Sequence, residues 1–232
     1  MIGLLNGFRR VRYASGNTKF AADGNSLMAG AGSTGGQTLP VQLAALSPVT
    51  IVGGSIANVG VSAQSSRNMN GLENDGSPGT GTNVATDIQA QYDGGKANNI
   101  LLAWEVTNSL YFDRTVRQAV DDFWAYCDAR RGEGWKVVVL NTIPRYQNAA
   151  GGIATYNQKL IDANALLLAE WRSHANAHVD LRAPGSPFAF TSFNEADFTG
   201  SGVYDPDNIH GNNAGYAYGA AQCAAALLRV RA

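Results

Sequence analysis

Apolar, strand-like runs alternate with helical patterns along the chain, and this alternation limits its fold more than any other feature. Two of the runs, at 99–104 and 136–140, are apolar at nearly every position and not only at every second one. Such strands are typical of parallel sheets, because helices cover both faces. Strands that alternate with helices indicate one parallel sheet between two helical layers. We therefore expect an α/β fold, namely a three-layer α/β/α (flavodoxin-like) domain with about five parallel strands.

The expected elements can be placed from their hydrophobic periods and their turn residues. Strands are expected at 18–23, 49–52, 99–104, 136–140 and 178–181. Helices are expected at 37–46, 85–92, 154–172 and 212–230, and a further helix should follow an N-cap at Asp113 and end at Gly132. Neither an internal repeat nor a linker interrupts the pattern. We expect one domain over 18–232, preceded by an N-terminal extension at 1–17.

Composition excludes several classes of partner. The 232 residues carry a formal net charge of −1, whereas a protein that binds nucleic acid normally presents a basic face. No apolar run approaches the roughly 18 residues of a membrane span, and residues 1–7 are too short for the apolar part of a signal peptide. The expectation is a soluble protein that is not exported, in the cytoplasm or associated with a virion, with neither a nucleic-acid partner nor a membrane span.

The two cysteines lie far apart in the sequence and both fall in helical patterns. Cys127 and Cys223 have no histidine or second cysteine at a metal-ligand spacing. They are expected to be buried as small hydrophobic residues. A disulfide between them stays open at this point.

A serine follows the first expected strand, at the turn Asp23-Gly24-Asn25-Ser26. Open α/β sheets bind ligands at the carboxyl ends of their strands, so the Ser26 hydroxyl is well placed to act as a nucleophile. An alcohol needs a base to take its proton, and His210 is the natural candidate. A carboxylate would in turn hold the imidazole in the correct tautomer. Two aspartates, Asp205 and Asp207, lie close enough along the chain, and a tight turn over 207–210 favours Asp207.

Donors for an oxyanion can also be assigned from their positions. Gly60 offers a backbone N–H that a substrate can approach closely. Asn108 follows the apolar strand at 99–104 and offers a side-chain amide. Together with the N–H of Ser26, these groups would form an oxyanion hole.

Four sequence blocks, in this order, resemble the SGNH (GDSL-like) hydrolase superfamily. They are Ala22-Asp23-Gly24-Asn25-Ser26-Leu27, Asn58-Val59-Gly60-Val61-Ser62, Trp104-Glu105-Val106-Thr107-Asn108-Ser109 and Asp207-Asn208-Ile209-His210. The variants Asp-Gly-Asn-Ser-Leu and Trp-Glu-x-Thr-Asn look most like phage- or prophage-associated members. The chain departs from the family pattern at three positions: Asn25 stands in place of Asp, Val106 in place of Gly, and Ser109 in place of Asp.

The resemblance implies a serine esterase that works through an acyl-enzyme, without a metal or an organic cofactor. It implies small acyl groups, such as acetyl on a carbohydrate, as the preferred substrates, while thioesters and lysophospholipids stay open. Tyr111, next to the Asn108 block, is expected to line the substrate pocket. The alternative is a non-catalytic carbohydrate-binding or structural module on the same fold. The complete set of Ser26, His210 and Asp207 favours the enzyme.

Overall fold

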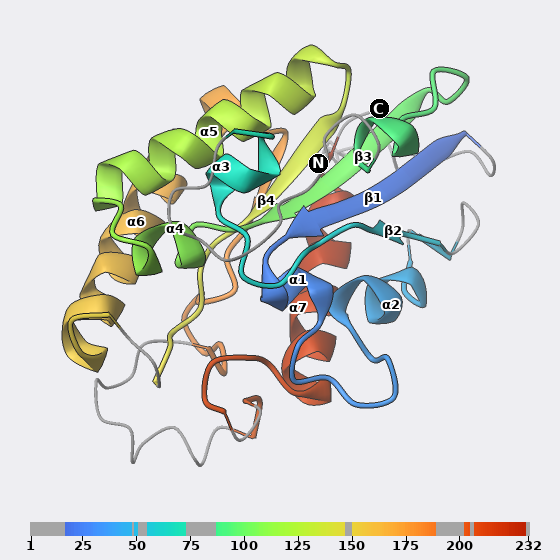
Figure 1. The fold of residues 1–232 in the computed structure, drawn as a ribbon. Coiled ribbons are helices and arrows are strands. Elements are labelled where there is room, and N and C mark those ends of the chain that lie inside the picture. The colour runs from blue at the N-terminus through green and yellow to red at the C-terminus, as the bar shows by residue number, and fades with distance from the viewer. Residues whose placement is uncertain are drawn as a thin grey trace, which may run out of the picture.

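A five-stranded, wholly parallel sheet forms the centre of the molecule (Figure 1). This computed structural model describes residues 17–47, 49–50, 55–72, 87–146, 150–188, 202–204 and 207–230. The strands are β1 (Thr18–Gly24), β2 (Ala57–Asn58), β3 (Asn98–Trp104), β4 (Lys136–Leu140) and β5 (Ala177–Val179), in the spatial order β2-β1-β3-β4-β5. The expected α/β fold with parallel strands is confirmed.

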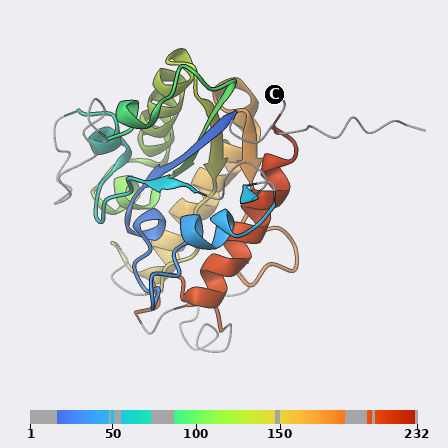
Figure 2. The same ribbon diagram turned by 90° about the vertical axis from the view of Figure 1, so that its right-hand side faces the viewer.

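Helices cover both faces of the sheet (Figures 1 and 2). One face carries α1 (Ser26–Ala29), α2 (Leu39–Ala44) and α7 (Asn213–Leu227). The other carries α3 (Ser66–Met69), α4 (Thr107–Tyr111), α5 (Val116–Gly132) and α6 (Ile153–His174). A short 3-10 helix, η2 (Gln89–Gln91), precedes β3. The three-layer arrangement follows from the sequence, because a strand that is apolar on both sides must be covered on both sides.

Successive residues of each strand feed two separate cores. In β1, Phe20 and Ala22 belong to the cluster under α2 and α7, while Ala21 belongs to the cluster under α5 and α6. The two cysteines are divided in the same way, with Cys223 in the first cluster and Cys127 in the second. Both are buried and free, so the sheet separates two thiols that the sequence left open to pairing.

The second strand differs from the expectation. We expected it at 49–52, but Val49 lies in a turn, Thr50 lies outside any strand, and 51–52 lie outside the described residues. The second strand along the chain is β2, which pairs with the outer side of β1, with Ala21 opposite Ala57 and Ala22 opposite Asn58. A two-residue strand at a sheet edge has too few positions to show a hydrophobic period. At the other edge, β5 covers 177–179 where 178–181 was expected.

Two helix predictions also need correction. Asp113 does not cap α5: it has a left-handed φ of 64°, and Thr115 is the N-cap, paired with Gln118 in a capping box. The expected end of that helix at Gly132 is confirmed. Within the expected helix at 85–92, the described residues form only η2, and residues 85–86 lie outside the described part.

The strand order places a crevice at the end of β1. The strands that follow β1 lie on its two sides, with β2 on one and β3 on the other. The chain therefore leaves the carboxyl end of β1 where neighbouring connections diverge, which is where open α/β sheets bind their ligands. The first helix after that point begins at Ser26. Among the described residues, no helix is long and apolar enough to cross a membrane.

Candidate active site

The turn after β1 places Ser26 at the first position of α1. Asn25 is the N-cap, and its side-chain oxygen accepts a hydrogen bond from the Leu27 N–H at 2.9 Å. This bond satisfies one of the backbone donors that a helix start leaves open. Asn25 stands where the family pattern has Asp, and an amide oxygen caps a helix as an aspartate does. The departure at this position therefore keeps the local structure of the turn.

Gly24 lets this turn press against the end of β3. Its φ is 159°, and a Cβ at this position would lie 2.3 Å from the carbonyl oxygen of Trp104. The same carbonyl accepts a hydrogen bond from the Asn25 N–H at 3.3 Å. A side chain at Gly24 would push the serine turn away from β3, so glycine is required here on steric grounds.

A buried carboxylate supports the turn from below. Asp23 has no exposed surface and accepts hydrogen bonds from the Gly24 N–H at 2.8 Å, the Gln64 amide at 3.1 Å and the Tyr126 hydroxyl at 2.6 Å. Burial and the charge of Asp23 raise the pKa of Tyr126 well above its ordinary value, so the phenol keeps the proton that it donates. These bonds fix the backbone three residues before Ser26.

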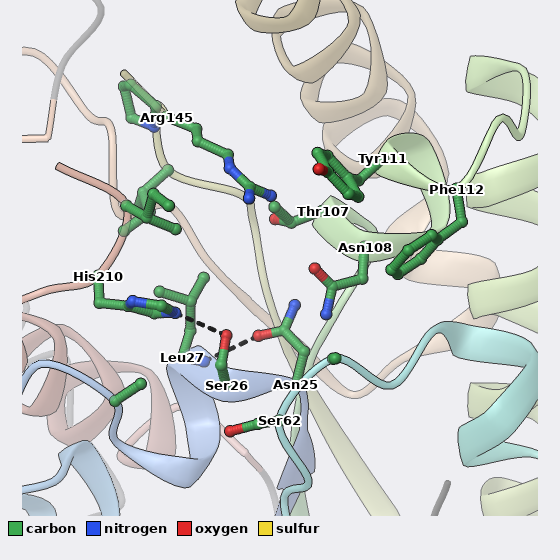
Figure 3. Close-up of a pocket in the computed structure, with 15 residues that line it drawn as sticks. Asn25, Ser26, Leu27, Ser62, Thr107, Asn108, Tyr111, Phe112, Arg145 and His210 are labelled. Carbon is green, nitrogen blue, oxygen red and sulfur yellow. Dashed lines mark hydrogen bonds between the residues drawn. The ribbon is translucent and has the colours of Figure 1, made fainter. Parts of the chain in front are cut away.

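Ser26, His210 and Asp207 form one hydrogen-bonded chain. The Ser26 Oγ lies 2.8 Å from His210 Nε2, and His210 Nδ1 lies 2.5 Å from Asp207 Oδ2 (Figure 3 shows the first contact). The sequence separates Ser26 from His210 by 184 positions. The fold thus brings together the nucleophile, base and carboxylate that the motifs predicted.

The other oxygen of Asp207 holds the loop itself. Asp207 Oδ1 accepts hydrogen bonds from the N–H groups of Ile209, at 2.8 Å, and His210, at 3.0 Å. Partial burial raises the pKa of Asp207, but the bonds from the His210 backbone, the His210 ring and the Ile209 backbone outweigh it. The net effect is a pKa below the ordinary value. Asp205, the alternative partner, lies outside the described residues.

Neighbouring segments hold the histidine loop in place. The Tyr146 N–H donates to the carbonyl of Asn208 at 2.9 Å, which connects the loop to the segment after β4. Asn208 has a φ of 53°, which asparagine tolerates better than most residues. Directly after the loop, Asn212 caps α7 by accepting hydrogen bonds from the N–H groups of Ala214 and Gly215.

Asn108 lies in α4 and faces the cavity beside Ser26 (Figure 3). Its side-chain Nδ2 donates to the carbonyl of Gln64 at 3.1 Å. That bond fixes the amide plane, and an amide carries a second N–H that can serve a substrate. Asn108 is only 8% exposed, so its amide is held in one orientation by the protein and is largely shielded from water.

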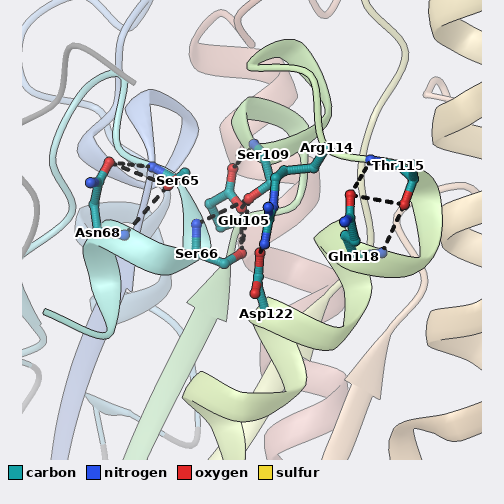
Figure 4. Close-up of polar contacts among 9 residues, drawn as sticks. All are labelled: Ser65, Ser66, Asn68, Glu105, Ser109, Arg114, Thr115, Gln118 and Asp122. Atoms are coloured by element: carbon teal, nitrogen blue, oxygen red, sulfur yellow. Dashed lines mark hydrogen bonds and ion pairs between the residues drawn. The ribbon is translucent and has the colours of Figure 1, made fainter. Parts of the chain in front are cut away.

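A buried glutamate anchors α4 (Figure 4). Glu105 has no exposed surface, and it accepts hydrogen bonds from the backbone of Asn108 at 2.7 Å and of Ser109 at 3.2 Å. It also binds the hydroxyls of Ser66 at 2.6 Å and Ser109 at 3.0 Å. Burial raises the pKa of Glu105, and these hydrogen bonds oppose that effect. Ser109, which stands where the family pattern has Asp, therefore helps to hold the segment that carries Asn108.

The third departure, Val106, carries backbone strain. Its φ is 121°, a left-handed value that a β-branched residue rarely adopts. Its side chain is fully buried in the core under α5 and α6. Glycine, the usual residue of the family pattern, would adopt this backbone without strain.

Gly60, the predicted oxyanion donor, lies after β2 and has a structural contact of its own. Its N–H donates to the Asn58 side chain at 3.1 Å. A Cβ on Gly60 would lie 3.0 Å from the backbone nitrogen of Ala29, so its small size lets this segment pack against α1. Gly60 is absent from the described lining of the cavity, where Ser62 and Ala63 lie instead. Ala63 has a left-handed φ of 64°.

The cavity at this site has a volume of about 390 Å³. Tyr111 lines it, as expected, next to Phe112 and opposite the serine turn (Figure 3). The remaining described lining residues come from five stretches of the chain: Asn25, Ser26, Leu27, Ala31, Ser62, Ala63, Thr107, Asn108, Ile143, Pro144, Arg145, Ile209 and His210.

Two of these residues, Ala63 and Arg145, were not predicted from the sequence. Ala63 carries no signal, because alanine is not a residue type that predicts a left-handed backbone. Arg145 follows β4 in a Pro-Arg-Tyr segment whose place beside the cavity depends on the packing of α4 and α6. Asn157, a polar residue inside a helical pattern, is the one hint, since its side chain fixes the backbone of Arg145.

The other two described histidines lie away from this cavity. His174 ends α6 and binds Asp128 at 2.8 Å, whereas His178 lies in β5. Within the described part of the chain, no group of three or more His, Cys, Asp or Glu side chains could hold a metal ion.

Comparisons with known proteins agree on the fold. No family model and no curated protein sequence matches this chain. Solved structures do match. A member of the lipolytic protein G-D-S-L family from Veillonella parvula has a TM-score of 0.61 at 14% identity, over 89% of this chain and 96% of that one. A candidate SGNH hydrolase from Slackia heliotrinireducens has a TM-score of 0.61 at 17% identity, over 92% and 99%.

A third structure of this kind is an acetyl xylan esterase, with a TM-score of 0.60 at 12% identity, over 89% of this chain and 98% of that one. At these identities the likeness concerns the arrangement of the backbone. This chain therefore has the fold of the GDSL and SGNH hydrolases.

Proposed function

We propose that the protein is a serine esterase that cleaves esters of short acyl groups, with acetyl as the preferred one. The observation that carries the proposal is the chain of hydrogen bonds from Ser26 through His210 to Asp207 at the wall of a cavity. The fold supports it, because solved structures of a lipolytic protein and an acetyl xylan esterase share the arrangement of the backbone.

In the acylation step, the Ser26 oxygen attacks the ester carbonyl while His210 Nε2 takes the hydroxyl proton. Asp207 holds the ring through Nδ1 and stabilises the imidazolium that forms. The tetrahedral oxyanion would accept hydrogen bonds from the Ser26 N–H and the Asn108 amide. The predicted third donor is the Gly60 N–H, which in this structure is bound to the Asn58 side chain and would have to turn to the substrate.

His210 then returns the proton to the leaving alcohol, which departs and leaves the acyl group on Ser26. In the second half, His210 takes a proton from water as the water oxygen attacks the acyl carbonyl. Collapse of that intermediate releases the acid and restores the Ser26 hydroxyl. None of these steps needs a metal or an organic cofactor.

The preference for acetyl, and for carbohydrate as the alcohol, extends the proposal beyond the fold. It is supported by the acetyl xylan esterase among the similar structures and by a cavity of moderate volume with several polar lining residues. A phage or prophage origin stays an interpretation of the Ser26 and Asn108 blocks.

The test compares wild type with Ser26→Ala on 4-nitrophenyl acetate and on an acetylated xylan. We expect turnover by wild type and a loss of at least about 10³-fold in the variant. An organophosphate should add to the wild-type chain once, at Ser26, as peptide mass spectrometry would show. Tight binding of acetylated glycan without turnover would instead favour the non-catalytic module.

A further inference from the structure

Glu105 is a buried carboxylate that takes no part in the steps of the proposed reaction. It directly follows β3, has no exposed surface and is absent from the described lining of the cavity. A substrate in the cavity therefore does not touch it. Burying a carboxylate is unfavourable unless its oxygens are hydrogen-bonded, so what those oxygens bind shows what the residue does.

One oxygen binds the backbone of the helix that carries Asn108. Glu105 Oε1 accepts from the Asn108 N–H at 2.7 Å and from the Ser109 N–H at 3.2 Å. These are two of the backbone donors that the start of a helix leaves open. Val106, at the N-cap position, gives α4 no side-chain cap. Glu105 therefore fixes the place of the Asn108 backbone.

The other oxygen binds the segment that orients the Asn108 amide (Figure 4). Glu105 Oε2 accepts from the Ser66 hydroxyl at 2.6 Å. Ser66 lies two residues after Gln64, whose carbonyl accepts from Asn108 Nδ2 at 3.1 Å. The Ser109 hydroxyl donates to Glu105 Oε2 at 3.0 Å and accepts from the Ser66 N–H at 3.1 Å. These contacts form a closed ring that begins and ends at Glu105.

The closed ring determines the direction of the free end of the Asn108 amide. One N–H of the amide binds the Gln64 carbonyl, and the second N–H lies in the same plane. The plane is set by two points, namely the Asn108 backbone and the Gln64 carbonyl. Glu105 holds the first directly and the second through Ser66.

We propose that Glu105 is a positioning residue, whose carboxylate directs the Asn108 amide toward the oxyanion. The inference rests on the proposed esterase function, in which Asn108 is an oxyanion donor. Such a donor acts mainly in the transition state, so loss of Glu105 should lower kcat and leave KM nearly unchanged. The effect should also disappear in a protein that lacks the Asn108 amide.

The first test is a double-variant cycle on 4-nitrophenyl acetate. Glu105→Met has a similar size without the hydrogen bonds, and kcat should fall about 10- to 100-fold with KM within about twofold of wild type. Glu105→Gln keeps an acceptor for the two N–H groups and should retain most of kcat. In the Asn108→Ala background, Glu105→Met should lower kcat by less than about twofold. An equal loss in both backgrounds would overturn the proposal.

Ser66→Ala tests the same ring with a smaller change, in case Glu105→Met does not fold. It removes one hydrogen bond, and kcat should fall about fivefold, again only while the Asn108 amide is present. Ser186→Ala is the matched control, because the Ser186 hydroxyl is also buried and donates to a backbone carbonyl, that of Leu181, away from the cavity. An unchanged kcat in Ser66→Ala, or an equal fall in both serine variants, would overturn the proposal.

The second test needs no turnover and separates this inference from the esterase function. The side-chain amide of Asn108 is followed by NMR and identified by its loss in Asn108→Ala. Its hydrogen exchange should become about tenfold faster in Ser66→Ala and stay unchanged in Ser186→Ala. This difference, in a protein without turnover that depends on Ser26, would refute the esterase and leave Glu105 as the residue that orients the amide. Turnover that depends on Ser26, with neither kcat nor amide exchange altered in Ser66→Ala, would refute the role of Glu105 alone.

Discussion

The carboxylate of Asp207 has two tasks, because one oxygen binds the His210 ring and the other binds the backbone of the same loop. Asp207→Asn should retain most of the backbone contacts but can hold the wrong imidazole tautomer. We expect kcat to fall by roughly 10²–10⁴ on 4-nitrophenyl acetate. Asp205→Asn should lower kcat by less than about tenfold, and a larger loss there would reverse the assignment of the carboxylate.

Asp128→Asn is a matched control for that variant, because Asp128 also pairs with a histidine, His174, at 2.8 Å, but away from the cavity. Its kcat should stay within about twofold of wild type.

The contribution of Asp207 to the stability of the folded protein depends on pH in a defined direction. Folding lowers the pKa of Asp207, so its ionised form stabilises the fold above its ordinary pKa of 3.8, and this contribution is lost as the pH falls through the folded value.

Asn108 donates from an amide that Gln64 already orients. Asn108→Ala removes the donor and should lower kcat by about 10²–10³. KM should change little, because the bond is made mainly in the transition state. Steady-state kinetics on one ester check this, and a change confined to KM would show that Asn108 binds substrate instead.

Among the secondary-structure elements, the connection from β3 to α4 contains the clearest strain. Val106 combines a φ of 121° with a fully buried side chain. Val106→Ala loses the packing and keeps the strain, whereas Val106→Gly loses the packing and relieves the strain, which costs about 1–3 kcal/mol in such a conformation. We expect Val106→Gly to be the more stable of the two variants in urea unfolding.

A glycine variant is usually less stable than the alanine variant at the same position, and we expect the reverse at Val106. Val120 is a control position at which the usual result is expected. Val120 is equally buried in the same core but lies inside α5. There, glycine should be less stable than alanine by about 1 kcal/mol. If alanine proves more stable than glycine at both positions, the strain assigned to Val106 is absent.

Helices and strands with a hydrophobic period over several residues were predicted from the sequence. Elements whose position depends on a single capping or pairing contact were not. The strand at 136–140 and the helix at 154–172 were both predicted, because each pattern extends over several residues. Both Asp113 and Thr115 suit an N-cap, and only the Gln118 that completes the capping box favours Thr115. The strand β2 offers two residues, so its place is set by pairing with β1.

The same distinction applies to the candidate site. Asp207 and His210 are three residues apart, so a local motif could predict their contact. Asn108 follows the apolar run at 99–104, so its position near the carboxyl end of a strand could be predicted. Ala63 and Arg145 reach the cavity through loops whose paths are set by contacts distant in sequence, such as that between Asn157 and Arg145. A short sequence motif contains only neighbouring residues, so it cannot predict contacts of this kind.

For the whole molecule, the sheet separates two buried thiols. Burial raises the pKa of both Cys127 and Cys223, so both stay protonated at neutral pH. A thiol reagent such as Ellman's reagent should therefore react with neither in the folded protein and with both in denaturant. Reducing agent should leave the melting temperature unchanged. Rapid reaction of a thiol in the folded protein would contradict the burial described for it.

The contact between Ser26 and His210 also has a kinetic consequence. The two residues are 184 positions apart, so the site cannot exist until the end of the chain has docked beside its beginning. Contacts between distant parts of a chain form slowly, because closing a long loop costs entropy before any contact compensates it. A refolding chain could regain helical content well before it regains the ability to turn over an ester. Returning activity would then report the completion of folding, and a chain stalled on the ribosome before α7 would be inert even with its serine turn already formed.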